Sequence, residues 1–154
     1  MEEKSLGAIV KAGRQPIADV LQYGERPQAP GLYFIDAWMS SICLPVGFAA
    51  FGAQLMIFQM GGAGFPSRDP IMPAHSTGVV MPLMYMTGNR EAYERGSDGI
   101  DFCSSDVLEG KMSLETASSQ LLDMILELAS GRVTKVETLN VQDPIEMYVK
   151  GPVF

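Results

Sequence analysis

Two short apolar runs, residues 31–36 and 54–60, stand on either side of residues 44–52, an apolar stretch with many small side chains. Both outer runs are apolar at most positions rather than at every second one, which is typical of parallel strands buried on both faces. We therefore predict a strand, a right-handed crossover helix and a second strand. The second strand leads into a glycine-rich turn, residues 61–64. Open parallel sheets bind ligands beyond the carboxyl ends of their strands, so we expect a site at this turn.

The rest of the chain is predicted to add helices before this unit and further strands and helices after it. Proline-rich residues 65–76 suit neither a helix nor a central strand and predict a long loop. Together the elements predict a single α/β domain over residues 1–154, with a three-layer, mainly parallel, Rossmann-like sheet and flanking helices. The predicted helices are 2–12, 17–23, 90–95 and 114–128, the further strands are 83–86 and 100–103, and residues 145–149 are an edge strand or a tail that packs on a partner.

Composition narrows the class of protein. The 154 residues are 47% hydrophobic, enough for one domain with a buried core, and the net charge of -7 gives no broad attraction to nucleic acid or to an anionic membrane. Cys43 and Cys103 have no metal-ligand spacing, so we expect reduced, buried thiols in a cytoplasmic protein. We expect no signal peptide, and no membrane span because Pro45, Gly47 and Gly52 interrupt the longest apolar run.

The glycine turn is the first candidate binding site. Consecutive backbone N–H groups around Gly61, Gly62 and Gly64 can form a nest for an anion, and glycine allows a ligand to approach closely. The alternative is a sharp turn with no ligand. The spacing matches neither the dinucleotide fingerprint nor the P-loop, which disfavours a nucleotide-binding Rossmann domain.

Three side chains near the predicted crevice are further candidates. Arg68 can bind a carboxylate through two parallel hydrogen bonds, or lie in solvent or pair with Asp69. His75 is the single histidine, and a pKa of about 6.5 suits a general base or a metal ligand, although a lone loop histidine is often ordinary surface. Asp36 ends the first strand of the unit, where it can bind ligand or cap the next turn.

Several stretches resemble, in order and spacing, the carboxy-terminal region of the sugar-acid dehydratases, the galactarate and altronate dehydratase group. Residues 3–13 with Pro16 and Ile17 resemble the family's EKAxGxIxKSGxxPI lead-in. Asp98 and Asp101 fall where the family has a DxMDxNAG segment. The resemblance spans roughly residues 3 to 140, and its other matching segments are residues 49–53, Phe58, 109–115 and 128–137.

This resemblance implies a hydro-lyase that removes water from a sugar acid with the help of a divalent metal (Fe or Mn/Mg), bound by residues that we cannot name. It implies a carboxy-terminal domain or fragment, inactive alone, whose partners are upstream domains or a subunit; we also expect a homo-oligomer. Asp101 and His75 are the expected catalytic residues, and Asp98 joins the expected substrate-binding group. The alternative is a non-catalytic ligand-binding or assembly module of the same fold.

The chain departs from the family pattern at the expected ligand end. The family's Thr-Thr-Gly-Arg-Gly loop is replaced by residues 59–64, Gln-Met-Gly-Gly-Ala-Gly, so the loop arginine is absent. Residues 66–81 look partly inserted, and Cys103 with two serines replaces the Asn-Ala-Gly that follows the family's second aspartate. The resemblance therefore predicts the family's fold for this chain, but it does not predict which sugar acid is the substrate.

Overall fold

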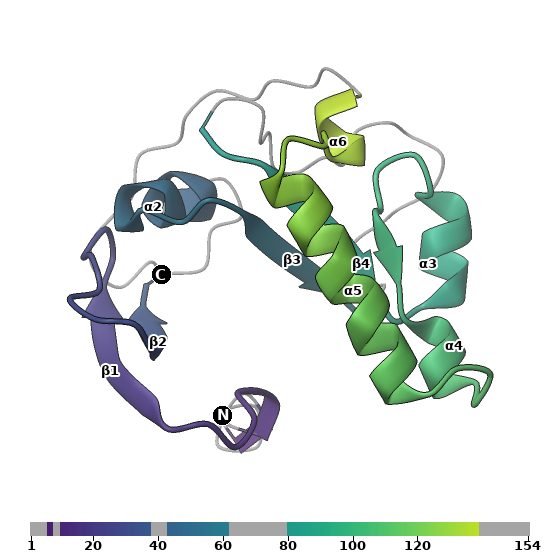
Figure 1. The fold of residues 1–154 in the computed structure, drawn as a ribbon, viewed down its shortest axis with the longest axis horizontal. Coiled ribbons are helices and arrows are strands. Elements are labelled where there is room, and N and C mark those ends of the chain that lie inside the picture. Colours follow the sequence, from purple (N-terminus) through teal and green to yellow (C-terminus); the bar gives the residue numbers. More distant parts are fainter. Residues whose placement is uncertain (1–5, 8–9, 38–42, 62–79, 139–154) are drawn as a thin grey trace, which may run out of the picture.

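A computed structural model describes residues 6–7, 10–37, 43–61 and 80–138 (Figure 1). The strands form two parallel sheets, one of order β1-β2 and one of order β3-β4-β5. The elements are β1 (Ile17–Gln22), β2 (Leu32–Asp36), α2 (Cys43–Phe51), β3 (Met56–Met60), β4 (Leu83–Thr87), α3 (Arg90–Arg95), β5 (Phe102–Cys103), α4 (Ser105–Leu108), α5 (Leu114–Ala129) and α6 (Lys135–Thr138).

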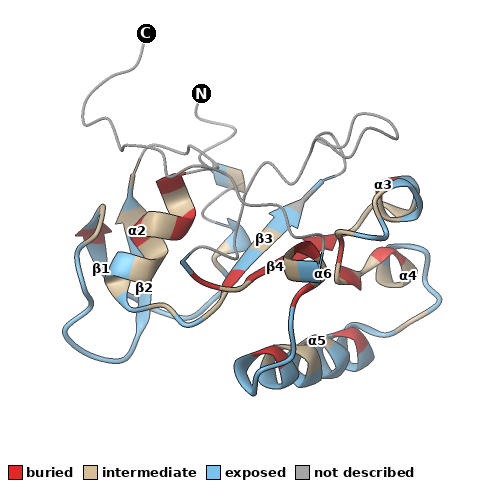
Figure 2. Ribbon diagram, turned by 90° about the horizontal axis from the view of Figure 1, so that it is seen from above, coloured by how far each residue is buried: buried red, intermediate tan, exposed pale blue. Residues whose placement is uncertain are grey.

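Strand β4 is the centre of the core, because all five of its residues are buried (Figure 2). Leu83 and Tyr85 pack into one cluster with Met56, and Met84 and Met86 pack into a second cluster. Alternate residues of a strand point to opposite faces of its sheet. The continuous apolar run in β4 therefore arises because both faces of the strand are covered.

Different helices cover the two faces. On the side of Leu83, the first cluster includes Phe48 of α2, Tyr93 of α3 and Val136 of α6. On the side of Met84, the second cluster includes residues of α5, namely Leu121, Met124, Ile125 and Leu128. The α/β class is thus confirmed, with helices on either side of a parallel sheet.

Helix α5 begins where the sequence predicts. The Ser113 hydroxyl accepts a hydrogen bond from the Thr116 N–H at 3.1 Å, which caps the first turn. After the helix, Gly131 has φ 104°, a conformation that favours glycine. The predicted apolar stripe is only partly buried, since Leu114 at its start is 66% exposed while Leu128 is 4% exposed.

The helix predicted over residues 17–23 is wrong. This segment is strand β1, which pairs in parallel with β2 so that Val20 lies beside Phe34. A proline fits the first residue of a strand as well as the first turn of a helix, so Pro16 does not discriminate between them. This segment is a strand because it pairs with β2, and the local sequence pattern does not reveal that pairing.

The predicted pairing of the two apolar runs is also wrong. Strand β2 pairs with β1 and strand β3 pairs with β4, so the strands at Leu32 and Ile57 belong to different sheets. Helix α2 between them was predicted correctly. It connects two sheets instead of crossing over within one, because the segment mistaken for a helix is the partner of β2.

Other predictions are confirmed in the described residues. Helix α3 follows Asn89, whose side-chain oxygen accepts from the Ala92 N–H at 2.9 Å. Residues 6–7 and 10–11 are helical, and the rest of the helix predicted over 2–12 lies outside the described residues, as do 145–149. Cys43 is buried, but Cys103 is only partly buried. Among the described residues, no helix is long and apolar enough to span a membrane.

Candidate functional site

The carboxyl ends of β3, β4 and β5 lie in one row. The strand pairing places Met60 beside Thr87 and Thr87 beside Cys103. The chain therefore leaves the sheet at Gly61, Gly88 and Ser104 along a common edge, which is where parallel sheets place their ligand crevices. The Ser104 N–H donates to the Thr87 carbonyl at 2.8 Å, which holds the start of α4 against the end of β4.

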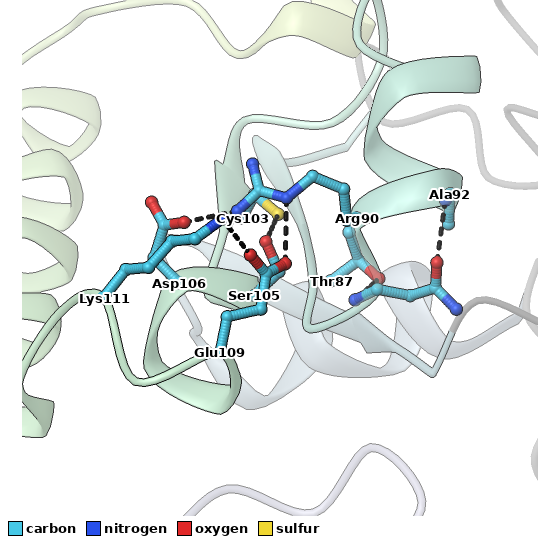
Figure 3. A network of polar contacts seen from close by, with 9 residues as sticks. Thr87, Arg90, Ala92, Cys103, Ser105, Asp106, Glu109 and Lys111 are labelled. Carbon is cyan, nitrogen blue, oxygen red and sulfur yellow. Dashed lines mark hydrogen bonds and ion pairs between the residues drawn. The ribbon is translucent and has the colours of Figure 1, made fainter.

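A polar network joins the elements beyond this edge (Figure 3). Arg90, the first residue of α3, pairs with Asp106 of α4, and its Nε donates to Glu109 at 3.0 Å. Lys111 Nζ donates to the other Glu109 oxygen at 2.5 Å. These contacts raise the pKa of Arg90, chiefly through Glu109 and then Asp106, and lower the pKa of Glu109, chiefly through Lys111 and then Arg90. The network thus fixes α3 relative to α4.

The Glu109 pairing predicts a pH-dependent contribution to folding stability. Because the folded state lowers the pKa of Glu109 below its ordinary 4.5, the contribution is present above that value and is lost as pH falls through the folded pKa. Thermal unfolding of Glu109→Gln should show a lower Tm than the parent at pH 7 and a smaller difference at pH 3. Salt should also reduce the difference at pH 7, since the pairs are partly exposed. A Tm difference between parent and variant that is the same at pH 7 and at pH 3 would contradict this prediction.

A pocket of about 450 Å³ lies at the outer side of β5, bounded by α3, α4 and α5. Its volume is in the range of small-molecule sites. The Cys103 thiol points at the buried Ser105 and donates to its hydroxyl oxygen at 3.2 Å. The walls combine polar and apolar groups, among them Arg90, Asp101, Cys103, Ser105, Gln120 and Met124. Such a hollow can accept a small ligand that carries hydroxyl groups.

Asp101 lines this pocket, but its carboxylate is already bound to the backbone. One oxygen accepts from the Tyr85 N–H of β4 at 3.0 Å, and the other accepts from the Lys135 N–H at the start of α6 at 2.8 Å. The Asp101 N–H in turn donates to the Tyr85 carbonyl at 2.9 Å. Asp101 therefore connects the central strand to α6, and its predicted catalytic role stays a prediction.

Of the other predicted residues, those in the described part of the chain do not line this pocket. Asp98 is exposed in the turn after α3, Asp36 is exposed at the end of β2 in the other sheet, and Gly61 is exposed directly after β3. The remaining predicted site residues lie outside the described part of the chain; they are Gly62, Gly64, Arg68 and His75. The binding and catalytic roles of all these residues stay predictions.

Apart from Asp101, sequence reasoning did not single out the polar residues that line the pocket. Arg90 was considered only as part of a helix, and Cys103 only as a core residue. Their positions carried a usable signal, since Arg90 comes three residues after Thr87 and Ser105 two residues after Cys103, where strands β4 and β5 end.

The described residues do not offer a metal site. Among them, no group of three or more His, Cys, Asp or Glu side chains is placed to hold an ion. The two acidic side chains of the polar network, Asp106 and Glu109, are paired with Arg90 and Lys111. We therefore assign no chemical step to a metal on this part of the chain.

Comparison with known proteins decides the family. Residues 1–152 match the family described as D-galactarate/Altronate dehydratase, C-terminal. The chain belongs to this family. The family resemblance inferred from the sequence is thereby confirmed.

Individual relatives agree with this assignment. The chain is 34% identical to the beta subunit of (2R)-sulfolactate sulfo-lyase from Chromohalobacter salexigens, over 90% of the chain and 33% of that protein. It is 31% identical to altronate dehydratase from Bacillus subtilis, over 89% of the chain and 25% of that protein. It is 30% identical to altronate dehydratase from Escherichia coli, over 87% of the chain and 25% of that protein. The chain thus spans a quarter to a third of the length of these relatives, one of which is named a sulfo-lyase and two of which are named dehydratases.

Proposed function

We propose that this domain forms part of the substrate cleft of a hydro-lyase that dehydrates a sugar acid of the altronate or galactarate type. The observation that carries the proposal is the family match over residues 1–152. The pocket beside Cys103 and Ser105, at the carboxyl end of a parallel sheet, supports a binding role for this end of the domain. The remainder of the cleft comes from regions outside these residues.

Dehydration of such an acid needs a base, a proton donor and groups that hold the substrate carboxylate. A base removes the proton from the carbon beside the carboxylate, the hydroxyl on the next carbon leaves as water with a donated proton, and the resulting enol becomes a ketone. We assign the base to His75 or Asp101 and the grip on the substrate carboxylate to Arg68 and the turn of residues 61–64. Asp36 and Asp98 are proposed to accept hydrogen bonds from the substrate's hydroxyl groups.

The proposed divalent metal, Fe or Mn/Mg, belongs to the complete enzyme. Its ligands would come from outside the described residues. We further propose that the complete protein is a cytoplasmic homo-oligomer. The domain's acidic net charge of -7 gives it no general attraction to an anionic substrate, so binding depends on local donors.

The direct test is turnover by the complete coding sequence that contains residues 1–154. Altronate, galactarate and related aldonates and hexarates are incubated with and without added divalent metal, and the keto-deoxy product is measured. Product from any of these acids supports the proposal. Binding without turnover favours a non-catalytic module, and the absence of both refutes the sugar-acid assignment.

A second candidate function follows from the relative with 34% identity, which is named for the release of a sulfo group from (2R)-sulfolactate. That substrate also is a hydroxy acid, and the altered loop at residues 59–64 leaves the substrate class open to such a change. The same assay therefore includes (2R)-sulfolactate, with sulfite as the measured product. Sulfite release without dehydration of any sugar acid would favour this second function.

The pocket itself can be tested with Gln120→Trp. Gln120 lines the pocket from the exposed side of α5, so an indole there should fill the opening without disturbing the core. We expect kcat/KM for the accepted substrate to fall by roughly tenfold or more, because small misplacements of bound substrate have large kinetic effects. The matched control is Ser119→Trp, an exposed neighbour on another side of the helix. Equal kinetics in both variants would place the substrate elsewhere.

A further inference from the structure

The small sheet of β1 and β2 has one exposed apolar face. Pairing puts Ile17 beside Leu32 and Val20 beside Phe34, and Leu32 and Phe34 are two residues apart on the same face. Ile17 is 42% exposed and Val20 is 55% exposed, while Leu32 and Phe34 are each 39% exposed. We call this surface, made of Ile17, Val20, Leu32 and Phe34, the apolar sheet face. On the opposite face Leu21 is only 6% exposed.

This arrangement is incomplete for a parallel sheet. Parallel sheets occur almost only where both faces are covered, and a sheet of two strands is marginal without further packing. Within the described residues β1 and β2 pair only with each other, and the Tyr23 hydroxyl, directly after β1, donates to the Cys43 carbonyl of α2 at 2.7 Å. The exposed side therefore needs an apolar partner.

The partner docks on the face of the sheet rather than extending it by another strand beside β1. The backbone N–H groups of Val20 and Gln22 donate to the carboxylates of Asp19 and Glu25, at 2.8 and 2.9 Å. These donors are already used, and acidic side chains at a strand edge discourage further strand pairing. The four apolar side chains offer the contact surface instead.

We propose that the apolar sheet face binds an apolar surface of the region that precedes this domain in the complete lyase. The family is a carboxy-terminal domain, and the curated relatives are three to four times as long as the part that matches this chain. The other occupants to be distinguished are a second copy of the chain and the chain's own residues 139–154.

The first experiment measures thiol labelling in the complete protein. Val20→Cys is compared with Leu122→Cys on α5, because both parent side chains are 55% exposed in this domain. We expect a maleimide to label Val20→Cys at least about tenfold more slowly, as docking protects the site from solvent. The unsubstituted protein gives the background from Cys43 and Cys103. Equal labelling rates would overturn the proposal.

The second experiment identifies the occupant. Phe34 is replaced by p-benzoylphenylalanine in the complete protein, and the photo-crosslinked peptide is identified by mass spectrometry. A crosslink to the preceding region supports the proposal. A crosslink to a second copy of this domain, a crosslink to residues 139–154, or no crosslink would overturn it. Neither experiment uses turnover, so the result is independent of the proposed reaction.

Discussion

Asp101→Ala is expected to lower the free energy of unfolding by about 2–4 kcal/mol, because it removes two charge-assisted hydrogen bonds to backbone N–H groups. The Tyr85 N–H lies in the buried central strand, and the Lys135 N–H lies at the start of α6. Alanine leaves both donors without their acceptors, and the hydrogen-bonded link from β4 through Asp101 to α6 is lost. Urea unfolding of the parent and the variant measures the difference.

The control is Asp98→Ala, since Asp98 is an exposed carboxylate in the preceding turn. It should change the free energy of unfolding by less than about 0.5 kcal/mol. The comparison also separates two roles for Asp101. A variant that keeps the parent's stability and loses turnover would support catalysis and contradict the structural role, whereas loss of stability is the result that its hydrogen bonds predict.

The elements that were predicted correctly are those whose sequence reflects burial within a short stretch. Strand β4 is a run of apolar residues because both of its faces are covered, and α5 carries a capping serine, an apolar stripe and a terminal glycine. Each of these signals arises from contacts along a single element. They can be read without knowing which elements are neighbours.

The errors concern contacts between distant segments. Residues 17–22 carry no clear period, and their strand conformation depends on pairing with residues 32–36. Once β1 was missed, β2 was assigned the wrong neighbour and the two sheets were merged into one. The resemblance to the dehydratase family did not prevent this error. Its motifs give the order of the segments along the chain but not which strands pair with each other.

The sequence predicts a site at the carboxyl ends of the strands, on the principle that parallel sheets bind ligands there, and this location stays a prediction. Of the residues predicted for that site, Asp101 lines the pocket. The pocket itself is built from α3, β5, α4 and α5, and its polar residues include Arg90, Ser105 and Gln120. Arg90 and Ser105 follow the ends of two strands, which is a weak local signal, but nothing in the sequence places Gln120 beside them. Only the three-dimensional arrangement brings the three residues together.

The second large effect is expected at the centre of the core, where Leu83→Ala should lower the free energy of unfolding by about 3 kcal/mol, within a usual range of about 2–5. Leu83 is 0% exposed and packs with Met56, Ile100 and Val136, which belong to separate segments. A smaller side chain leaves a cavity that these segments cannot close without moving β4.

Leu114→Ala is the matched control for this prediction. The same methylene groups are removed at the start of α5, but Leu114 is 66% exposed and no cavity forms. Its effect should stay within about 0.5 kcal/mol by urea unfolding, because surface substitutions away from special features are nearly neutral. The two variants therefore distinguish the effect of burial from the effect of removing an apolar side chain. Both leucines are apolar and lie in predicted elements, but only Leu83 is buried in the core, in a strand covered by helices on both faces. Equal losses from the two variants would show that Leu114 is covered in the complete protein, or that β4 does not occupy the centre of the core.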